Sequence, residues 1–128
     1  MRTSVILSTY NQPRALELSL WGFAAQAVRD FEVVIADDGS RPDTAALVEA
    51  MRARTGLHLV HVWHEDRGFR KTEILNRAIL AAQGEYLIFS DGDCIPRRDL
   101  VAVHLAHARP ARTSSAVMAA LTAAGSLR

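Results

Sequence analysis

Two carboxylates, Asp91 and Asp93, lie one glycine apart just after an apolar run at residues 86–89. In an extended segment, residues two apart point the same way, so both side chains can converge on one point. Two like charges this close repel each other unless a cation lies between them. Hard oxygen ligands suit Mg²⁺ or Mn²⁺, which commonly bridge to substrate phosphates. The alternative is an Asx turn that ends a strand and leaves both charges solvated.

A second acidic pair, Asp37 and Asp38, follows another apolar run at residues 31–36 and precedes Gly39 and Ser40. One of these carboxylates could accept hydrogen bonds from a bound base or sugar. The alternative is a turn that also supplies the N-cap of the next helix, which is a common use of Asp and Ser. Neither acidic pair decides by itself between a ligand site and a turn, so their positions in the fold must decide.

Four apolar runs, at residues 4–7, 31–36, 57–63 and 86–89, predict four buried strands. Helices are predicted between them and after the last: one capped by Asn11, one starting at Pro42, one with an apolar stripe ending before Gly84, and one opened by Pro96. Strands separated by helices imply right-handed βαβ crossovers, and therefore an α/β fold with a mostly parallel sheet. The third run alternates in polarity, which places it nearer a sheet edge.

Polar clusters follow three of the predicted strands. They are Ser-Thr-Tyr-Asn at residues 8–11, the acidic pair at residues 37–38, and Asp-Gly-Asp at residues 91–93. Ligands of parallel sheets bind beyond the carboxyl ends of the strands, and these ends share one rim. The sequence therefore predicts a binding site formed by all three clusters.

Composition narrows the class of protein. A chain of 128 residues with 49% hydrophobic residues is sufficient for one globular domain. The formal net charge of +1 gives no basic excess that would point to nucleic acid, and no charged block points to a membrane surface. The single cysteine, Cys94, suits a reducing compartment, and no apolar run reaches the roughly 18 residues of a transmembrane span. We expect a cytoplasmic domain without a transmembrane segment.

The order of these motifs resembles the opening of the family 2 glycosyltransferases, which have the GT-A fold. That order is a strand, Thr9-Tyr10-Asn11, a helix, the strand F-E-V-V-I-A, then D-D-G-S, and later a strand that ends in D-x-D at residues 91–93. The similarity covers residues 3 to about 110. It implies a Rossmann-like, mostly parallel sheet flanked by helices and incomplete on its C-terminal side.

The resemblance also implies a ligand, a nucleotide-diphosphate sugar, with a UDP-sugar as the first expectation. Thr9, together with Tyr10 and Asn11 of the same motif, would hold the nucleotide at the end of the first strand. By its place in D-D-G-S, Asp38 would hydrogen-bond the base, and Asp37 is the second candidate for this role. The expected reaction is inverting hexosyl transfer to a carbohydrate, lipid-linked or protein-linked acceptor that the sequence does not identify.

For the metal, the resemblance implies that Asp91 lies near the ribose and the ion, and that Asp93 directly ligates Mn²⁺ or Mg²⁺. Such an ion neutralises a diphosphate leaving group. Before the D-x-D strand the chain departs from the family's N-x-G…R-N-x-G pattern: the spacing is longer and Leu75 replaces an arginine. Arg70 and Lys71 could instead supply positive charge to the phosphates, with a solvated helix face as the alternative.

In the family, the acceptor site and the general base lie downstream of D-x-D. Residues 111–128 contain no Asp, Glu, His or Tyr. The sequence therefore predicts a partial nucleotide-sugar-binding domain at residues 1–110, an Ala-rich tail of uncertain structure at residues 111–128, and an N-terminal portion of a larger transferase. One alternative is an inactive remnant that binds nucleotide or nothing.

Another alternative is a Mg²⁺-binding receiver domain, although its acidic pair normally follows the first strand rather than the second. Among the remaining candidates, the spacing of His58, His61 and His64 predicts that they do not converge on one point. Cys94 is interpreted as a small buried residue. No histidine neighbours it to activate the thiol, which argues against a role as nucleophile.

Overall fold

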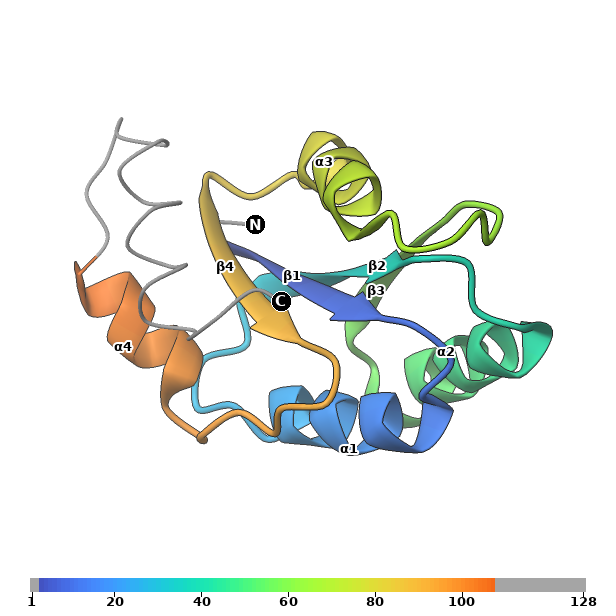
Figure 1. The fold of residues 1–128 in the computed structure, drawn as a ribbon. Coiled ribbons are helices and arrows are strands. Elements are labelled where there is room, and N and C mark those ends of the chain that lie inside the picture. Colours follow the sequence, from blue (N-terminus) through green and yellow to red (C-terminus); the bar gives the residue numbers. More distant parts are fainter. Residues whose placement is uncertain (1–2, 108–128) are drawn as a thin grey trace.

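The computed structural model describes residues 3–107, in which four strands alternate with four helices. The strands pair in the order β3-β2-β1-β4, and every neighbouring pair is parallel. This arrangement confirms the predicted α/β fold with a parallel sheet, and it also confirms the predicted edge position of the third strand (Figure 1). The elements are β1 (Thr3–Thr9), α1 (Pro13–Ala24), β2 (Phe31–Asp37), α2 (Pro42–Thr55), β3 (His58–Trp63), α3 (Lys71–Ala81), β4 (Tyr86–Asp91) and α4 (Leu100–His107).

Helices cover both faces of the sheet, with α3 on one side and α1 and α2 on the other (Figure 1). Alternate residues of each strand therefore enter different cores. In β1, Val5 and Leu7 belong to the core that contains Leu16 and Leu20 of α1, whereas Ile6 belongs to the core beneath α3. Burial of both faces explains why β1 and β2 are nearly continuous apolar runs in the sequence.

Three of the strands, β1, β2 and β4, extend further at their carboxyl ends than the apolar runs predict. Strand pairing continues through Ser8, opposite Asp91 of β4, and through Thr9, opposite Asp37 of β2. Polar residues can remain in these strands because they lie at the rim, where their side chains find partners. The ladder therefore places the chemistry-bearing residues in fixed register with one another.

Two predicted helix starts are wrong. The N-cap of α1 is Gln12 rather than Asn11, which has a φ of 48° and bonds the neighbouring loop instead. Helix α4 begins at Leu100 rather than at Pro96. Pro96 instead packs on α1, where a Cβ added to Gly22 would lie 2.6 Å from the Pro96 Cδ. Pro96 therefore belongs to a segment that packs against α1 and not to the first turn of α4.

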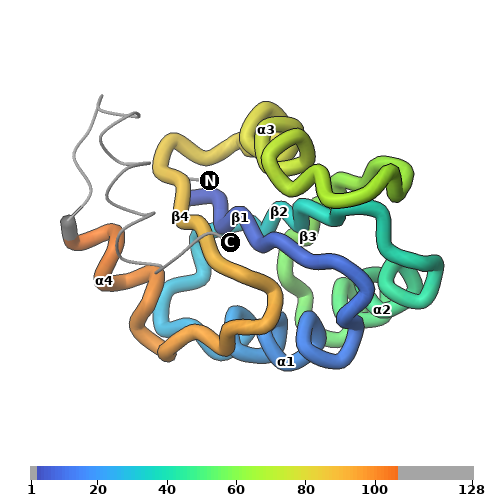
Figure 2. The backbone as a smooth tube through the Cα atoms, in the orientation of Figure 1, coloured from blue at the N-terminus to red at the C-terminus, as the bar shows by residue number. Residues whose placement is uncertain are grey.

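The segment between β4 and α4 passes beside α1 before the last helix begins (Figure 2). The Ser19 Oγ of α1 lies 2.9 Å from the carbonyl oxygen of Gly92 and 2.7 Å from that of Cys94. Gln26 is buried and binds the same segment, donating to the Arg97 carbonyl at 2.6 Å and accepting from the Val101 N–H at 3.1 Å. Helix α1, together with Gln26 just after it, therefore fixes the loop that carries Asp93.

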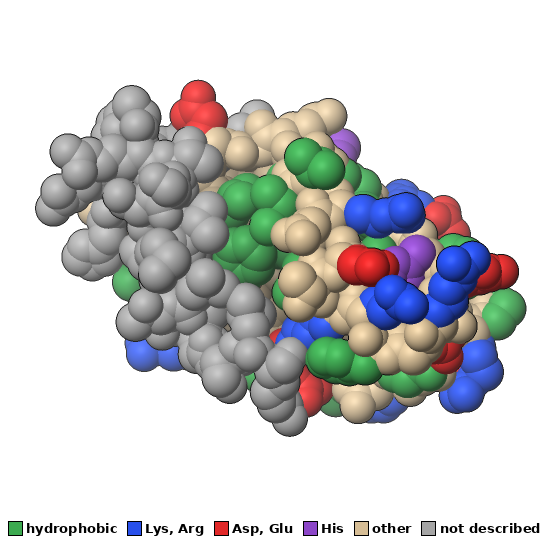
Figure 3. All heavy atoms as spheres, turned by 45° about the horizontal axis from the view of Figure 1, so that its top comes forward, with side chains coloured by type: hydrophobic (Ala, Val, Ile, Leu, Met, Phe, Trp, Pro, Cys, Tyr) green, Lys and Arg blue, Asp and Glu red, His purple; other side chains and the backbone are tan. Residues whose placement is uncertain are grey.

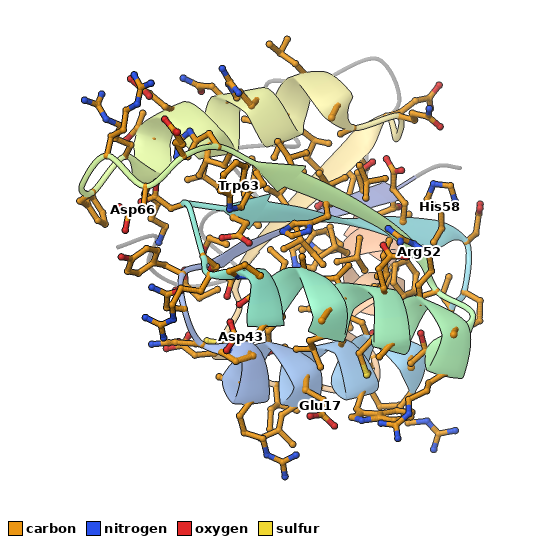
Figure 4. All side chains as sticks on the ribbon, turned by 90° about the vertical axis from the view of Figure 1, so that its right-hand side faces the viewer. Glu17, Asp43, Arg52, His58, Trp63 and Asp66 are labelled. Atoms are coloured by element: carbon orange, nitrogen blue, oxygen red, sulfur yellow. The ribbon has the colours of Figure 1, made fainter. Side chains whose placement is uncertain are left out.

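A buried carboxylate, Glu32, stabilises the opposite end of the sheet. Its Oε2 accepts hydrogen bonds from the Ser4 Oγ at 2.6 Å and from the Gln83 N–H at 2.7 Å, and its Oε1 lies 3.7 Å from the Nε2 of His58. Figure 4 shows His58 at one end of β3 and Trp63 at the other. This cluster therefore holds the loop before β4 in place and takes no part in the rim.

The expected tail at residues 111–128 lies outside the described residues, so the predicted division of the chain at residue 110 stays a prediction. Within residues 3–107, no helix combines the length and the apolar character that crossing a membrane requires.

Candidate nucleotide-binding cleft

A cleft of about 370 Å³ opens at the carboxyl ends of β1, β2 and β4, between them and the loop at residues 64–70. In Figure 4, Trp63 and Asp66 lie at this end of the sheet. Three strand ends and one loop thus contribute to the cleft, as the polar clusters in the sequence predict. Of the eight residues predicted to form the site, six line this cleft: Thr9, Tyr10, Asp38, Lys71, Asp91 and Asp93.

Asp91 is the last residue of β4 and has two side-chain partners on one oxygen. Its Oδ1 accepts a hydrogen bond from the Ser8 Oγ at 3.0 Å and another from the Lys71 Nζ at 3.0 Å. The next residue, Gly92, donates its N–H to the Ser8 carbonyl at 2.6 Å, and a Cβ there would lie 2.5 Å from that oxygen. Position 92 therefore requires glycine because the chain turns directly against β1.

Three ligand atoms gather next to this turn. A carboxylate oxygen of Asp91, one of Asp93 and the Cys94 Sγ all lie within 4.8 Å of one another. Cys94 is exposed, so the expectation that it is buried is wrong. The two carboxylates suit a hard divalent cation that keeps several positions for water or phosphate, whereas a thiolate prefers softer metals. The donor set thus fits Mg²⁺ or Mn²⁺ held by Asp91 and Asp93.

Asp38 is almost fully buried and both of its carboxylate oxygens have partners. Its Oδ1 lies 2.6 Å from the Nε2 of His64, and its Oδ2 accepts the backbone N–H of Arg70 at 3.0 Å. Its own N–H donates to the Thr9 carbonyl at 3.1 Å. A carboxylate held from both sides presents its remaining lone pairs in a fixed direction, which suits recognition of a planar hydrogen-bonding edge.

Asp37 has a different environment. Its Oδ1 accepts the Ser40 N–H at 2.9 Å, and its Oδ2 lies 2.7 Å from the Nε2 of His61, with the carboxylate buried. This is the turn interpretation of the D-D-G-S motif, and it applies to Asp37 alone. The prediction that the histidines do not converge on one point is compatible with this, but it missed that His61 and His64 each bind one of the two carboxylates.

Tyr10 and Asp66 join the end of β1 to the loop after β3. The Tyr10 hydroxyl donates to the Asp66 Oδ2 at 2.6 Å, and the Asp66 Oδ1 accepts the Gly68 N–H at 3.1 Å. The tyrosine hydroxyl first, and then the Gly68 N–H, lower the pKa of Asp66 below its ordinary value. The same hydrogen bond raises the pKa of Tyr10. Beside them, the side chain of Phe69 is 80% exposed and lines the cleft.

Two predicted site residues do not line the cleft. Asn11 connects two loops: its N–H donates to the Ser40 Oγ and its Oδ1 accepts the Arg41 N–H, both at 2.8 Å. The guanidinium of Arg70 pairs with Glu73 at 3.1 Å and borders a second, more polar groove beside β3. On the face drawn in Figure 3, basic and acidic side chains are interspersed. The Arg70 side chain therefore matches the solvated helix face, while its backbone N–H serves Asp38.

The fold is a parallel α/β sheet with acidic residues beyond the carboxyl ends of its strands, and in this class of fold ligands bind at that rim. The model of glycosyl transferase family 2 matches residues 4–126, and the chain belongs to this family. It is 36% identical over 111 residues to validoxylamine A glucosyltransferase of Streptomyces hygroscopicus subsp. jinggangensis (strain 5008), which covers 84% of this chain and 26% of that protein. An uncharacterized glycosyltransferase of Bacillus subtilis (strain 168) is 36% identical over 106 residues, covering 82% of this chain and 26% of that protein. The chain thus spans about a quarter of the length of these relatives.

Solved structures of glycosyltransferases also match this fold. A mannosyltransferase of Pyrobaculum calidifontis in complex with GDP-Man and Mn²⁺ has a TM-score of 0.75 at 33% identity, covering 85% of this chain and 33% of that one. TarS 1–349 of S. aureus in complex with UDP-GlcNAc has a TM-score of 0.74 at 30% identity, covering 83% and 30%. The fold is therefore that of the GT-A glycosyltransferases, and family membership argues against the receiver-domain alternative.

Proposed function

We propose that the cleft binds the nucleotide-diphosphate sugar that serves as donor in glycosyl transfer, together with a divalent cation held by Asp91 and Asp93. One observation carries the proposal: the D-x-D carboxylates and the fixed carboxylate of Asp38 border the same cleft, although they come from different strands. Two solved neighbours at 30% identity or more contain a nucleotide sugar, and one of these also contains Mn²⁺. These neighbours support the proposal for the present chain.

Different residues of the cleft would bind different parts of the donor. Asp38, oriented by His64 and by the Arg70 N–H, would accept a hydrogen bond from the base. Thr9 and Tyr10 border the cleft next to Asp38 and would contact the nucleotide. Asp91 and Asp93 would hold Mn²⁺ or Mg²⁺, which neutralises the charge that develops on a diphosphate leaving group. Lys71 would add one further positive charge on the same side of the cleft.

The chemical step is proposed to be inverting hexosyl transfer, and the first donor to test is a UDP-sugar. Inverting transfer requires a general base that deprotonates the acceptor hydroxyl. In the cleft, Asp38, Asp91 and Asp93 are already assigned to base and metal, and Asp66 is bonded to Tyr10 and Gly68. We therefore assign residues 3–107 to donor binding and leave the base and the acceptor contacts to another part of the enzyme, so that these residues alone would be inactive in transfer.

Calorimetry with UDP, in the presence of Mn²⁺ and then of a chelator, tests the proposal. Binding is expected with the metal and is expected to weaken strongly in chelator. Asp93→Asn should abolish the metal-dependent part, whereas Asp30→Asn, which alters an exposed carboxylate at the opposite end of the sheet, should bind like the wild type. Equal binding with metal and with chelator, unchanged in Asp93→Asn, would remove the metal role.

A further inference from the structure

Lys71 is the first residue of α3, and its ammonium donates to a carboxylate that the metal would need. The Lys71 Nζ and the Asp91 Oδ1 are 3.0 Å apart, with side chains only 14% and 13% exposed. The same oxygen accepts the Ser8 hydroxyl, so both of its lone pairs are already used. Limited exposure means that solvent and salt screen this ion pair less than a surface pair.

The position of Lys71 is unusual for a helix start. The N-terminus of a helix carries partial positive charge, so a cation in the first turn is unfavourable there and an anion is favourable. The counter-charge that compensates Lys71 in the structure is Asp91, which comes from a different element. A ligand with several negative charges, placed at the start of α3, would compensate the lysine at least as well as one carboxylate does.

Building on the proposed function, we propose that Lys71 and the divalent cation compete for Asp91, and that the diphosphate of the nucleotide ends this competition. In the protein without nucleotide, the ammonium binds one of the two carboxylate oxygens of Asp91, Oδ1, and its positive charge opposes a cation at the same carboxylate. When a diphosphate binds, the flexible four-carbon stem lets the ammonium move to the phosphate oxygens. Asp91 is then available to the cation, so that cation and nucleotide bind cooperatively.

In the alternative, Lys71 only connects α3 to β4 structurally. The two possibilities predict opposite changes in metal affinity when Lys71 is replaced. If Lys71 only stabilises the structure, its loss leaves Asp91 less well positioned, and metal affinity falls or stays the same. If Lys71 competes with the cation, loss of its ammonium leaves Asp91 available to the metal, and metal affinity rises. Reciprocity of binding free energies adds a second consequence: the factor by which Mn²⁺ improves UDP binding equals the factor by which UDP improves Mn²⁺ binding. Both factors should shrink when the competitor is gone.

The experiment measures Mn²⁺ binding by electron paramagnetic resonance of the free ion, and UDP binding by calorimetry, in wild type, Lys71→Met, Lys71→Gln and Lys71→Arg. Loss of the ammonium should tighten Mn²⁺ binding without UDP by roughly tenfold, the size of one hydrogen bond to a charged group. The coupling factor between Mn²⁺ and UDP should fall toward one in both neutral variants. Lys71→Arg keeps a cation and should bind Mn²⁺ alone no better than wild type.

Arg77→Gln is the matched control, because it removes one positive charge from an exposed position on the same helix. Its Mn²⁺ affinity should stay within about twofold of wild type, since a distant exposed charge is largely screened. Wild type that binds both ligands, with neutral Lys71 variants that bind Mn²⁺ no tighter, would overturn the competition and leave the donor site intact. Wild type that binds neither ligand would overturn the donor site and the competition together.

Discussion

The Nε2 of His64 lies 2.6 Å from the Oδ1 of Asp38, and both side chains are nearly buried. His64 follows β3, whereas Asp38 follows β2, so two neighbouring segments of the rim meet at this contact. The backbone N–H of Arg70 holds the other carboxylate oxygen. The direction in which Asp38 presents its lone pairs is therefore set by the loop at residues 64–70, and not by its own strand alone.

His64→Ala should weaken UDP binding in the presence of Mn²⁺ by about tenfold, because Asp38 loses a hydrogen bond to a charged group and with it a defined orientation. His64→Gln should recover part of the loss, since its amide N–H can reach the same oxygen. Calorimetry of both variants tests this. Equal losses in the two variants would show that packing of the imidazole ring, rather than the hydrogen bond, is what matters.

Asp38→Ala should weaken nucleotide binding by roughly ten- to a hundredfold, because a hydrogen bond to a charged group contributes about 1.5–3 kcal/mol. Binding of Mn²⁺ alone should barely change, since Asp38 does not belong to the group of ligand atoms around Asp91 and Asp93. The two affinities are measured separately, by calorimetry and by electron paramagnetic resonance. Parallel losses of both would contradict the division of roles between base and metal.

The hydroxyl of Tyr10 lowers the pKa of Asp66 more than any other group does. Tyr10→Phe should therefore raise the pKa of Asp66 back toward its ordinary value of 3.8. The pKa of Asp66 should return only part of the way, because the Gly68 N–H still donates to the carboxylate. A folded-state pKa below the unfolded one contributes stability above about pH 3.8, and this is lost as the pH falls through the folded pKa. Carboxyl carbon chemical shifts followed by NMR give the pKa; an identical titration in both proteins would exclude the Tyr10 hydroxyl as the cause.

The parts of the site that sequence patterns predicted are those fixed by local spacing and strand order. Asp91 and Asp93 lie close together because Asp91 ends β4 and Asp93 follows two residues later. Thr9 and Asp38 reach the same rim because parallel strands end together. Nothing beyond the βαβ order was needed to place them. The prediction of a parallel sheet and the prediction of a rim site thus rest on the same feature of the chain.

The parts that were not predicted depend on contacts between segments far apart in the sequence. His64 reaches Asp38 only because β3 pairs with β2 in one register and the following loop turns back over the rim. Whether Arg70 or Lys71 faces the cleft depends on the exact start of α3, and spacing alone left both possible. Asn11 is a residue type that commonly caps helices, but here its polar groups bond Ser40 and Arg41 in the loop after β2 instead.

Gly39→Ala should destabilise the fold and also weaken nucleotide binding, because glycine is required at this position for two reasons. Its φ is +94°, and a Cβ would lie 2.5 Å from the backbone Cα and N of Asp66. A non-glycine residue with positive φ costs about 1–2 kcal/mol, and forced overpacking about 1–3 kcal/mol more. The loop at residues 64–70 must then shift, and His64 shifts with it.

Gly56→Ala is the matched control for this last prediction, since Gly56 also has a positive φ, of 70°, but a Cβ there would meet nothing within 4 Å. Urea unfolding should give a loss of about 1–2 kcal/mol for Gly56→Ala and about 2–5 kcal/mol for Gly39→Ala. Nucleotide affinity should fall in Gly39→Ala alone, because only that substitution displaces the loop that orients Asp38. Equal losses of unfolding free energy in the two variants would mean that the approach of Gly39 to Asp66 adds nothing to the conformational requirement, and that the loop is positioned by Tyr10 and His64 instead.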